Sequence, residues 1–422
     1  MTDNTVYWLW LSLAVTPGSD TFAKLIKKHP SAEEIYSLDK DDLISVIGSK
    51  SKDLLALSDK ELSRAKEIYN FCATKNIGIL LYSDHKYPNQ LKEIGNPPVL
   101  LYYRGVLPDF SNSFCVSIVG TRRLSEYGKK NAFNIAFDLS RAGATVVSGM
   151  AIGIDGVSHA GAIAAEMPTV AVIGSGIDVC YPTQHMVLAR EIVKNGCVFT
   201  EFPPGTAPNG YNFPVRNRII SGLSKVTLVI EGKERSGALL TARHAKNQGR
   251  AVYALPGNVG NKNSELSNLL IKNGASLCTS ADDIIRDFEN ESRGILNPFL
   301  LAKHISVDMH STLERLRIAA VSIDDNIFRP SMRKKKDVVE KNEPVNEVLQ
   351  NVLQEKSQEK SIEGFDSNAI KVYKKIPPGQ ECTIEALIDD ELSLRIVMNS
   401  LLKLEIGRFI TMLPGEKVRR NF

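Results

Sequence analysis

The chain has 422 residues, of which 43% are hydrophobic and 24% are charged, and its formal net charge at pH 7 is +4. This composition is typical of a globular protein with two or three domains, and the mild charge means that any basic surface has to be local. The apolar run from Val6 to Val15 is too short to cross a bilayer and follows no basic segment, so we expect a cytoplasmic protein without a signal peptide or membrane helix. Six scattered cysteines without a CxxC pair and seven dispersed histidines predict reduced thiols and no metal centre.

Residues 1 to about 75 carry apolar positions at helical spacing, interrupted by short turns. In "TPGSDTFAKLI" and "SVIGSKSKDLLAL" a glycine precedes a helical run, and the expected N-caps are Ser19 or Asp20 for the first run and Ser51 for the second. The pattern predicts a small helical module of the SAM or helix-hairpin-helix kind. Such modules contact DNA phosphates in some proteins and pack against protein in others, and the sequence leaves both interpretations open.

From about 76 to 290, apolar strands alternate with helical stretches of crossover length. Several strands are continuously apolar, as expected for a parallel sheet that is buried on both faces. The predicted fold class is therefore α/β, with an extended, Rossmann-like, doubly wound sheet. The expected strands are 77–82, 99–103, 114–120, 145–149, 169–174, 197–201, 225–231 and 250–255, and the expected helices include 127–142, 154–166, 183–195 and 236–248.

Beyond residue 290 the periodicity is lost and then returns. Residues 291 to about 365 contain the basic run Arg333–Lys336 in a polar tract, and we expect a flexible linker in which this run is either solvated or an aid to DNA binding. From about 366 to 422, three helical stretches and a two-strand wing around Pro414 and Gly415 predict a winged-helix domain. Its third helix offers few cations, which favours an interaction module over a reader of DNA grooves.

The chemistry of the central domain is expected at the carboxyl ends of the strands, where open α/β sheets bind ligands. Glycines there let backbone amides approach a ligand, and helix N-termini favour anions. Gly120, Thr121 and Arg122 are predicted to hold one phosphate through backbone, hydroxyl and guanidinium. The residues expected to frame a second phosphate are Ser148, Gly149, Gly153, Gly174, Ser175 and Gly176. Neither a G-x-G-x-x-G opening nor a G-x-x-x-x-G-K-[ST] loop is present, so we expect no nucleotide cofactor.

Candidate catalytic groups are few. Asp155 and His159 are four residues apart on one predicted helix and follow Ser148, which is compatible with a hydrolase, but no G-x-S-x-G elbow accompanies them. Glu201 and Glu231 each end a strand and could bind Mg²⁺ or anchor a loop. We therefore expect a protein that is not an enzyme.

The segment "NFPVRNRIISGLSK" (212–225) places arginines in a stretch that otherwise has the pattern of a buried helix. Arg216 and Arg218 are two apart and point to different sides of a helix. We expect one to reach phosphate and the other to lie nearer the packing boundary, where it can pair with a carboxylate. Phe213 either stacks on an unpaired base or belongs to the core, and a cationic groove with aromatic platforms is how single strands are held without sequence preference.

The central segments together resemble the DNA-processing protein A family, also called DprA or Smf. The matching stretches are "VGTRRLSEYG", "SGMAIGIDGVSHAGAI", "VIGSGIDVCYP", "NFPVRNRIISGLS", "VIEGKERSGALLTARHAKNQGRAVYALPG" and "NLLIKNGA". The resemblance implies a bacterial, cytoplasmic protein that binds single-stranded DNA without sequence preference and loads the recombinase RecA in natural transformation and homologous recombination. It also implies a homodimer, and single-strand-binding protein is a further expected partner.

The resemblance assigns DNA contacts to particular residues. The phosphate loop of the family corresponds to Gly120, Thr121 and Arg122. Its F-P-x-R-N-R segment corresponds to Phe213, Arg216, Asn217 and Arg218, and its S-G-x-L-x-T-A helix start corresponds to Ser236, Gly237 and Thr241. A basic residue often precedes the Phe in the family, whereas this chain has Asn209, Gly210, Tyr211 and Asn212, so Tyr211 is an alternative stacking contact.

Two other classes of function compete with DNA binding. Phosphoribohydrolases on the same scaffold carry P-G-G-x-G-T-x-x-E, of which "LPGNVGNKNSE" keeps little. An adaptor for RecA that acts only through the winged helix leaves the arginine-bearing strand ends unexplained.

Overall fold

The structure, a computed structural model, describes residues 4–318 except 293 and 302–306, and residues 367–420 with gaps at 378–379, 390–391, 393–395, 398–399, 402–403, 405–408 and 414–416. The chain forms two compact units, Met1–Phe328 and Arg329–Phe422. The basic run Arg333–Lys336 lies outside the described residues. None of the helices in the described part is both long and apolar enough to cross a membrane.

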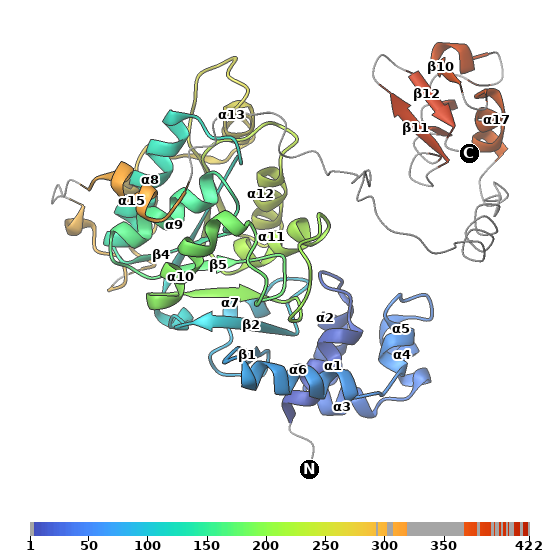
Figure 1. The fold of residues 1–422 in the computed structure, drawn as a ribbon, viewed down its shortest axis with the longest axis horizontal. Helices are drawn as coiled ribbons and strands as arrows, with labels where there is room; N and C mark the ends of the chain where they lie inside the picture. The colour runs from blue at the N-terminus through green and yellow to red at the C-terminus, as the bar shows by residue number, and fades with distance from the viewer. Residues whose placement is uncertain are drawn as a thin grey trace, which may run out of the picture. The chain divides into compact units, whose positions relative to one another are not determined.

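The first unit begins with the helical module that the sequence predicts (Figure 1). Its first helix is buried along most of its length because it is apolar on nearly every side, with Trp8, Leu9 and Leu11 at 1% exposure or less. Ser31 and Asp39 cap the third and fourth helices by accepting hydrogen bonds from backbone amides. The helices are α1 (Asn4–Ala14), α2 (Thr21–Lys28), α3 (Ala32–Ser37), α4 (Lys40–Ile47), α5 (Leu54–Ser58) and α6 (Ser63–Thr74).

The expected caps differ in detail. Asp20 takes the N-cap position of α2 without a side-chain hydrogen bond, and Asp53, not Ser51, stands before α5. The carboxylate of Asp53 instead accepts hydrogen bonds from the backbone and hydroxyl of Thr16 and from the hydroxyl of Ser19 at 3.2 Å. These bonds lower the pKa of Asp53 even though burial by itself raises it. The carboxylate therefore joins two segments, the loop before α2 and the start of α5.

The central domain is an α/β domain, as predicted, but its sheet is mixed. The strand order is β1-β2-β6-β5-β4-β3-β7-β8-β9, and the pairs β1–β2 and β2–β6 are antiparallel while the others are parallel. The short last strand was not expected from the sequence. The strands are β1 (Gly78–Leu81), β2 (Leu100–Gly105), β3 (Phe114–Val119), β4 (Ala144–Ser148), β5 (Thr169–Val172), β6 (Cys197–Thr200), β7 (Val226–Val229), β8 (Ala251–Ala254) and β9 (Ser276–Leu277).

Helices cover both faces of the sheet (Figure 1). Successive strand residues belong to different cores, as Val146 packs in the cluster that includes α8 and α9 while Val147 packs with α11 and α12. This division is why the strands are apolar at every position. The helices are α7 (Asn89–Lys92), α8 (Glu126–Arg141), α9 (Ile154–Ala164), α10 (Met186–Asn195), α11 (Asn212–Gly222), α12 (Gly237–Asn247), α13 (Glu265–Lys272) and α14 (Ala281–Asp287), with 3-10 turns at Phe110–Asn112 and Thr183–His185.

The order of the strands places a topological switch between β3 and β7. The chain leaves β3 and passes outward through β4, β5 and β6, then returns to pair β7 with the free side of β3. In sheets of this kind the carboxyl ends of the two strands at the switch open into the crevice where ligands bind. The strand order therefore predicts a ligand site at the loops that follow β3 and β7.

Residues from 291 onward differ in part from the expected linker. Pro298–Leu300 form a 3-10 turn, and α15 (Met309–Arg315) packs its buried residue Leu313 into the same core as α8 and α9. The second unit has helix α17 (Ser367–Lys375), the 3-10 turn Glu385–Leu387 and a sheet of β10 (Glu381–Thr383), β12 (Lys417–Arg420) and β11 (Ile410–Leu413), in that order. The antiparallel pair β11–β12 lies where the sequence predicts a wing, and the complete winged helix stays a prediction.

Candidate nucleic-acid interface

Loops from four strands meet the start of α11 at the carboxyl edge of the parallel strands, and we call this edge the mouth. The loop after β3 and the start of α9 are joined by a hydrogen bond from the Ile154 amide to the Thr121 carbonyl at 3.2 Å. Gly153 has a φ of +93°, and a Cβ there would lie 2.4 Å from that carbonyl, so only glycine permits this approach. The Thr121 hydroxyl accepts a hydrogen bond from the Arg123 amide at 3.1 Å, which closes the turn.

Arg122 is exposed in this turn, and its guanidinium lies 5.5 Å from the centroid of the Phe213 ring. Phe213 is itself half-buried, because its ring packs against Tyr181 at 5.6 Å and lies close to Gly174, where a Cβ would be 3.0 Å away. Arg122 forms no ion pair within the described residues. The ring therefore braces a guanidinium whose charge no carboxylate neutralises directly.

Arg216 lies 5.9 Å from the centroid of the same Phe213 ring and is only 4% exposed. Its guanidinium donates to the carbonyl of Gly149 at 2.7 Å and to the carbonyl of Val172, which follow or end β4 and β5. Its Nε donates to the side-chain oxygen of Asn217 at 3.2 Å. The arginine thus satisfies backbone acceptors at the ends of two buried strands.

Asp155 is the charged neighbour of Arg216. A Cβ on Gly149 would lie 2.5 Å from the Asp155 carboxylate and 2.8 Å from a nitrogen of the Arg216 guanidinium, so both groups converge on this glycine. Burial raises the pKa of Asp155, and the guanidinium lowers it in part. Burial also disfavours the charged form of Arg216 and lowers the pKa of its guanidinium to about 10. The positive charge of Arg216 is therefore partly compensated within the protein.

Arg218 is 1% exposed and points away from the mouth. Its guanidinium forms a two-pronged ion pair with Glu201, with N–O distances of 2.5 and 2.7 Å, and its Nε donates to the Asn96 carbonyl at 3.0 Å. This is the arginine that pairs with a carboxylate. Its partners leave it no free face for a phosphate.

Asn217 and the start of α12 lie on the other side of α11. The Asn217 side chain donates to the Gly237 carbonyl at 3.3 Å, which ties the two helices together. Ser236 holds the N-cap position of α12, but its hydroxyl is buried without a hydrogen-bond partner. Thr241 is 1% exposed and donates weakly to the Gly237 carbonyl. Of this group, Gly237 is the residue that is openly exposed.

The residues expected to frame a second phosphate lie deeper than predicted. Ser148 and Ser175 are fully buried, and their hydroxyls donate to the carbonyls of Ile118 at 2.6 Å and Val179 at 2.8 Å. These hydroxyls are thus used by backbone acceptors in β3 and in the loop after β5, because a buried hydroxyl needs a partner. The glycines beside them, Gly149, Gly174 and Gly176, are also buried, whereas Gly120 is half-buried.

The alternative catalytic and metal sites are occupied by internal contacts. The Nδ1 of His159 bonds the Thr169 hydroxyl at 2.7 Å, and burial lowers the pKa of this histidine to about 3. Glu231 accepts hydrogen bonds from the backbone and hydroxyl of Ser125, the N-cap of α8, and so supplies the anion at that helix N-terminus. In the described part of the chain, no group of three or more His, Cys, Asp or Glu side chains could hold a metal ion.

Comparison with known proteins agrees with this architecture. Residues 78–289 match the model of the DNA recombination-mediator protein A family. DNA processing protein DprA of Bacillus subtilis is 39% identical over 225 residues, which are 53% of this chain and 76% of that protein. The chain belongs to the DNA recombination-mediator protein A family. The resemblance seen in the sequence is thereby confirmed.

Other members of the family match over different shares of their length. Protein Smf of Escherichia coli is 43% identical over 204 residues, 48% of this chain and 54% of that protein, so the chain spans about half of it. The X-ray structure of DNA processing protein A from Streptococcus pneumoniae has a TM-score of 0.58 and 31% identity, and the match covers 68% of this chain and 98% of that one. The DNA processing protein A of Helicobacter pylori, solved for its single-stranded DNA binding mode, matches with a TM-score of 0.47 and 26% identity over 51% of this chain and 96% of that one.

Three further residues at the mouth are exposed. Two of them, Lys233 and Arg235, were not predicted from the sequence as contacts, and Tyr211 was predicted only as an alternative stacking contact. Lys233 and Arg235 are exposed in the loop after β7, the strand that pairs with β3 at the switch. Tyr211, just before α11, is 78% exposed. The stretch "EGKERSG" contains the two cations, but only the strand order places their loop beside the loop of Arg122.

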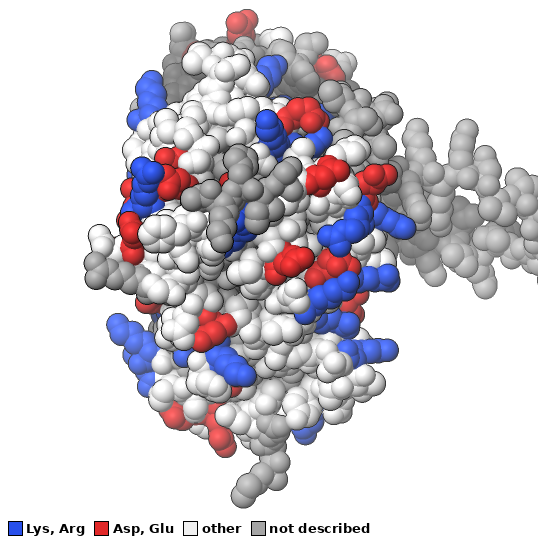
Figure 2. Space-filling model, turned by 90° about the vertical axis from the view of Figure 1, so that its left-hand side faces the viewer, with Lys and Arg blue, Asp and Glu red and all other residues white. Residues whose placement is uncertain are grey.

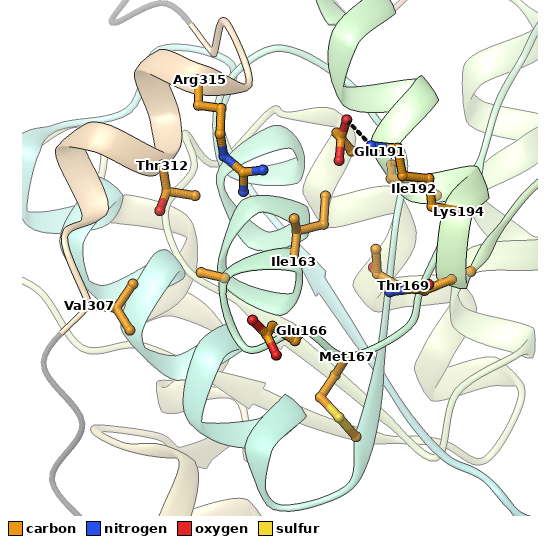
Figure 3. Close-up of a pocket in the computed structure, with 13 residues that line it drawn as sticks. Ile163, Glu166, Met167, Thr169, Glu191, Ile192, Lys194, Val307, Thr312 and Arg315 are labelled. Atoms are coloured by element: carbon orange, nitrogen blue, oxygen red, sulfur yellow. Dashed lines mark hydrogen bonds and ion pairs between the residues drawn. The ribbon is translucent and has the colours of Figure 1, made fainter.

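Away from the mouth the surface is less distinctive. On the face in Figure 2, Lys and Arg are interspersed with Asp and Glu. A cavity of about 510 Å³ opens at the amino ends of β5 and β6, where Arg315 extends from α15 toward α9 (Figure 3). Glu166 and Glu191 line it together with Lys194, which pairs with Glu191 at 2.7 Å. Because the two carboxylates balance Arg315 and Lys194, the cavity carries no net positive charge and has no electrostatic attraction for a polyanion.

Proposed function

We propose that this protein binds single-stranded DNA at the mouth without sequence preference and delivers the strand to the recombinase RecA. The observation that carries the proposal is Arg122, an exposed guanidinium that forms no ion pair with the residues the structure describes and is braced by Phe213. It stands at the strand-order switch where α/β sheets bind their ligands. A guanidinium in such a place suits a phosphodiester, because its planar fork matches two phosphate oxygens.

The neighbouring groups suit the rest of a strand. Lys233 and Arg235 lie on the loop across the switch and can follow the phosphates, and Gly237 exposes backbone at the start of α12. Tyr211 offers an open aromatic ring on which a base of any sequence can stack. Bases in a duplex are already stacked and paired, so a platform of this kind favours the single strand.

The partners follow from the family. Its description as a recombination mediator supports RecA as the recipient of the strand, and single-strand-binding protein is the natural occupant of the DNA that RecA receives. The DNA processing protein A of Helicobacter pylori has a single-stranded DNA binding mode, and we extend that ligand class to this chain because both are DNA processing proteins of one family. We also propose that the protein acts as a homodimer.

The direct test compares labelled single- and double-stranded oligonucleotides by fluorescence anisotropy between about 50 and 200 mM salt. We expect tighter binding of the single strand and a steep loss of affinity with salt. Equal affinity for both forms, or the release of a base or sugar from nucleotides without DNA binding, would overturn the proposal. Assembly of RecA filaments on DNA coated with single-strand-binding protein tests the delivery step, and a lack of stimulation would remove that step alone.

A further inference from the structure

A second cationic cleft lies between the helical module and the sheet domain. Its volume is about 350 Å³, which falls in the range of small-ligand sites, roughly 300–1,000 Å³. It opens between α2 and α7, and we call it the α2–α7 cleft. Its lining residues are Ala23, Ile26, Lys27, Pro30, Tyr82, Lys92, Ile94 and Pro97.

The two lysines of the cleft are not neutralised. Neither Lys27 nor Lys92 forms an ion pair in the part of the chain that the structure describes, whereas Lys24 on the same helix pairs with Asp20 at 2.8 Å. The ammonium group of Lys92 lies 5.2 Å from the centroid of the Tyr82 ring, a contact that orients it without cancelling its charge. The cleft therefore attracts an anion.

The walls of the cleft are apolar and firmly packed. Ile26 and Ile94 face it from the two sides, and prolines complete its rim. Tyr82 is held edge-on by Phe22, at a ring distance of 5.1 Å and an angle of 89°, and its hydroxyl forms no hydrogen bond with the described residues. Cations beside apolar walls and a free hydroxyl suit a ligand that carries a phosphate next to a flat apolar group.

The cleft is connected to the mouth through short contacts. The loop before α2 touches the first turn of α11, since a Cβ on Gly18 would lie 3.0 Å from Val215. The Asn96 side chain donates to the Gly18 carbonyl at 2.9 Å, while its own carbonyl accepts from the buried Arg218. Pro97, the next residue, lines the cleft. These contacts fix the loop before α2 and Asn96 against α11, whose first turn lies at the mouth.

We propose that the α2–α7 cleft binds a nucleotide of the same DNA strand after that strand leaves the mouth. Lys27 and Lys92 contact the phosphate, and the proline and isoleucine walls contact the base or sugar. The proposal rests on DNA binding at the mouth. An acidic protein segment would satisfy the same lysines, but the packing of the loop before α2 against the first turn of α11, which lies at the mouth, favours the strand.

The test uses the full chain with two oligonucleotides, one of about 6 nucleotides that fills the mouth and one of about 20 that reaches further. In the double variant Lys27→Gln/Lys92→Gln, affinity for the short oligonucleotide stays unchanged and affinity for the long one falls roughly tenfold. The salt slope of the long oligonucleotide falls by about 0.7, since both lysines contact one phosphate and each phosphate contact to a single strand contributes about 0.7. The variant Lys24→Gln removes one charge from the same helix face and leaves both affinities within about twofold of wild type.

Each contrary result has a distinct meaning. If the double variant binds the long oligonucleotide as tightly as wild type does, the proposal for the cleft is overturned while DNA binding at the mouth is unaffected. If the double variant instead loses affinity for an acidic peptide, the occupant of the cleft is an acidic protein segment. An equal loss in Lys24→Gln overturns the proposal for the cleft too, since a diffuse field would then explain the effect. If wild-type protein binds neither oligonucleotide, the proposed function fails as well. Lys27→Gln alone, which spares the Lys92–Tyr82 contact, serves if the double variant unfolds, with a smaller loss of affinity for the long oligonucleotide expected.

Discussion

Two arginine-bearing segments approach the same edge of the sheet and use their charge differently. In the loop after β3, Arg122 is exposed and rests on the ring of Phe213. In α11, Arg216 and Arg218 are 4% and 1% exposed and are surrounded by protein acceptors. The difference shows that the guanidiniums of α11 build the mouth, whereas the guanidinium of the β3 loop is available to a ligand.

Buried strand ends explain the difference. Parallel strands that stop inside the protein leave carbonyl groups that need donors, and α11 delivers donors to the carbonyls of Gly149 and Val172. Glu201 directly follows the next strand, β6, and needs a counter-charge, which Arg218 supplies. A residue that meets such needs is held rigidly, which suits a scaffold better than a contact with DNA.

The largest expected effect is on the buried ion pair. Arg218→Leu leaves Glu201 as an unpaired buried charge, so we expect a loss of about 3–5 kcal/mol in the free energy of unfolding. Urea unfolding followed by tryptophan fluorescence measures it, because both tryptophans, Trp8 and Trp10, belong to the first unit. The matched variant Arg218→Leu/Glu201→Leu should regain much of the loss. A loss below about 1 kcal/mol would mean that the pair behaves as an exposed one.

A smaller loss, about 2–3 kcal/mol, is expected for Arg216→Gln, which leaves backbone acceptors and Asp155 short of partners. This loss should depend on pH. The pKa of Asp155 is raised in the folded state, so the folded protein binds a proton at this carboxyl more readily than the unfolded chain does. The ionised carboxylate therefore lowers the free energy of unfolding at high pH. This loss is recovered as pH falls toward 3.8 and the carboxyl becomes protonated.

Removing Arg216 raises the pKa of Asp155 further. The stability deficit of Arg216→Gln should therefore shrink when pH falls from about 8 to about 5. Urea unfolding at both pH values checks this. In the double variant Asp155→Asn/Arg216→Gln this part of the pH dependence should vanish, and a deficit that grows on acidification would contradict the assigned contact.

Tyr211 tests the exposed side of the mouth. Tyr211→Ala should weaken the binding of single-stranded DNA by about 1–2 kcal/mol, because it removes a stacking surface, and should leave the unfolding free energy nearly unchanged. Tyr211→Phe keeps the ring and should bind as wild type does. Full affinity in Tyr211→Ala would show that the exposed ring does not contact a base.

The smallest effect is expected for Phe213→Leu, which keeps an apolar side chain but removes the cation–π contacts of the ring with Arg122 and Arg216. Affinity for single-stranded DNA should fall by about 0.5–1 kcal/mol, because Arg122 loses its brace. If Phe213 acts through Arg122, the effects of Phe213→Leu and Arg122→Gln should not add in a double-mutant cycle. Additive losses would instead make Phe213 an independent base platform.

The sequence identifies the segments of the site but not the orientation of each side chain. Strand runs and glycine-rich turns follow local patterns, so the α/β domain and the loops of the mouth could be predicted. The fate of Arg218 depends on Glu201 and on the carbonyl of Asn96, which is 122 positions away. Such pairing comes from the packing of α11 on the sheet.

The strand order is likewise decided by long-range pairing. β7 returns to the free side of β3, so the loop with Lys233 and Arg235 lies across the switch from Arg122. The antiparallel β1 and β2 are apolar runs like the parallel strands, and their direction could not be read from composition. Ser148 and Ser175 have the residue types of a phosphate site, but strand ends that continue into buried loops enclose them.

The salt dependence of single-stranded DNA binding by Arg122→Gln tests the central claim most directly. Arg64→Gln is the matched control, because Arg64 lies on α6 and pairs with Glu67 at 2.8 Å on the surface. If Arg122 contacts a phosphate, affinity falls by about 1.5–3 kcal/mol and the salt slope falls by about 0.7 in Arg122→Gln, while the control matches wild type. An unchanged affinity and slope in Arg122→Gln would contradict the claim that this guanidinium faces the DNA.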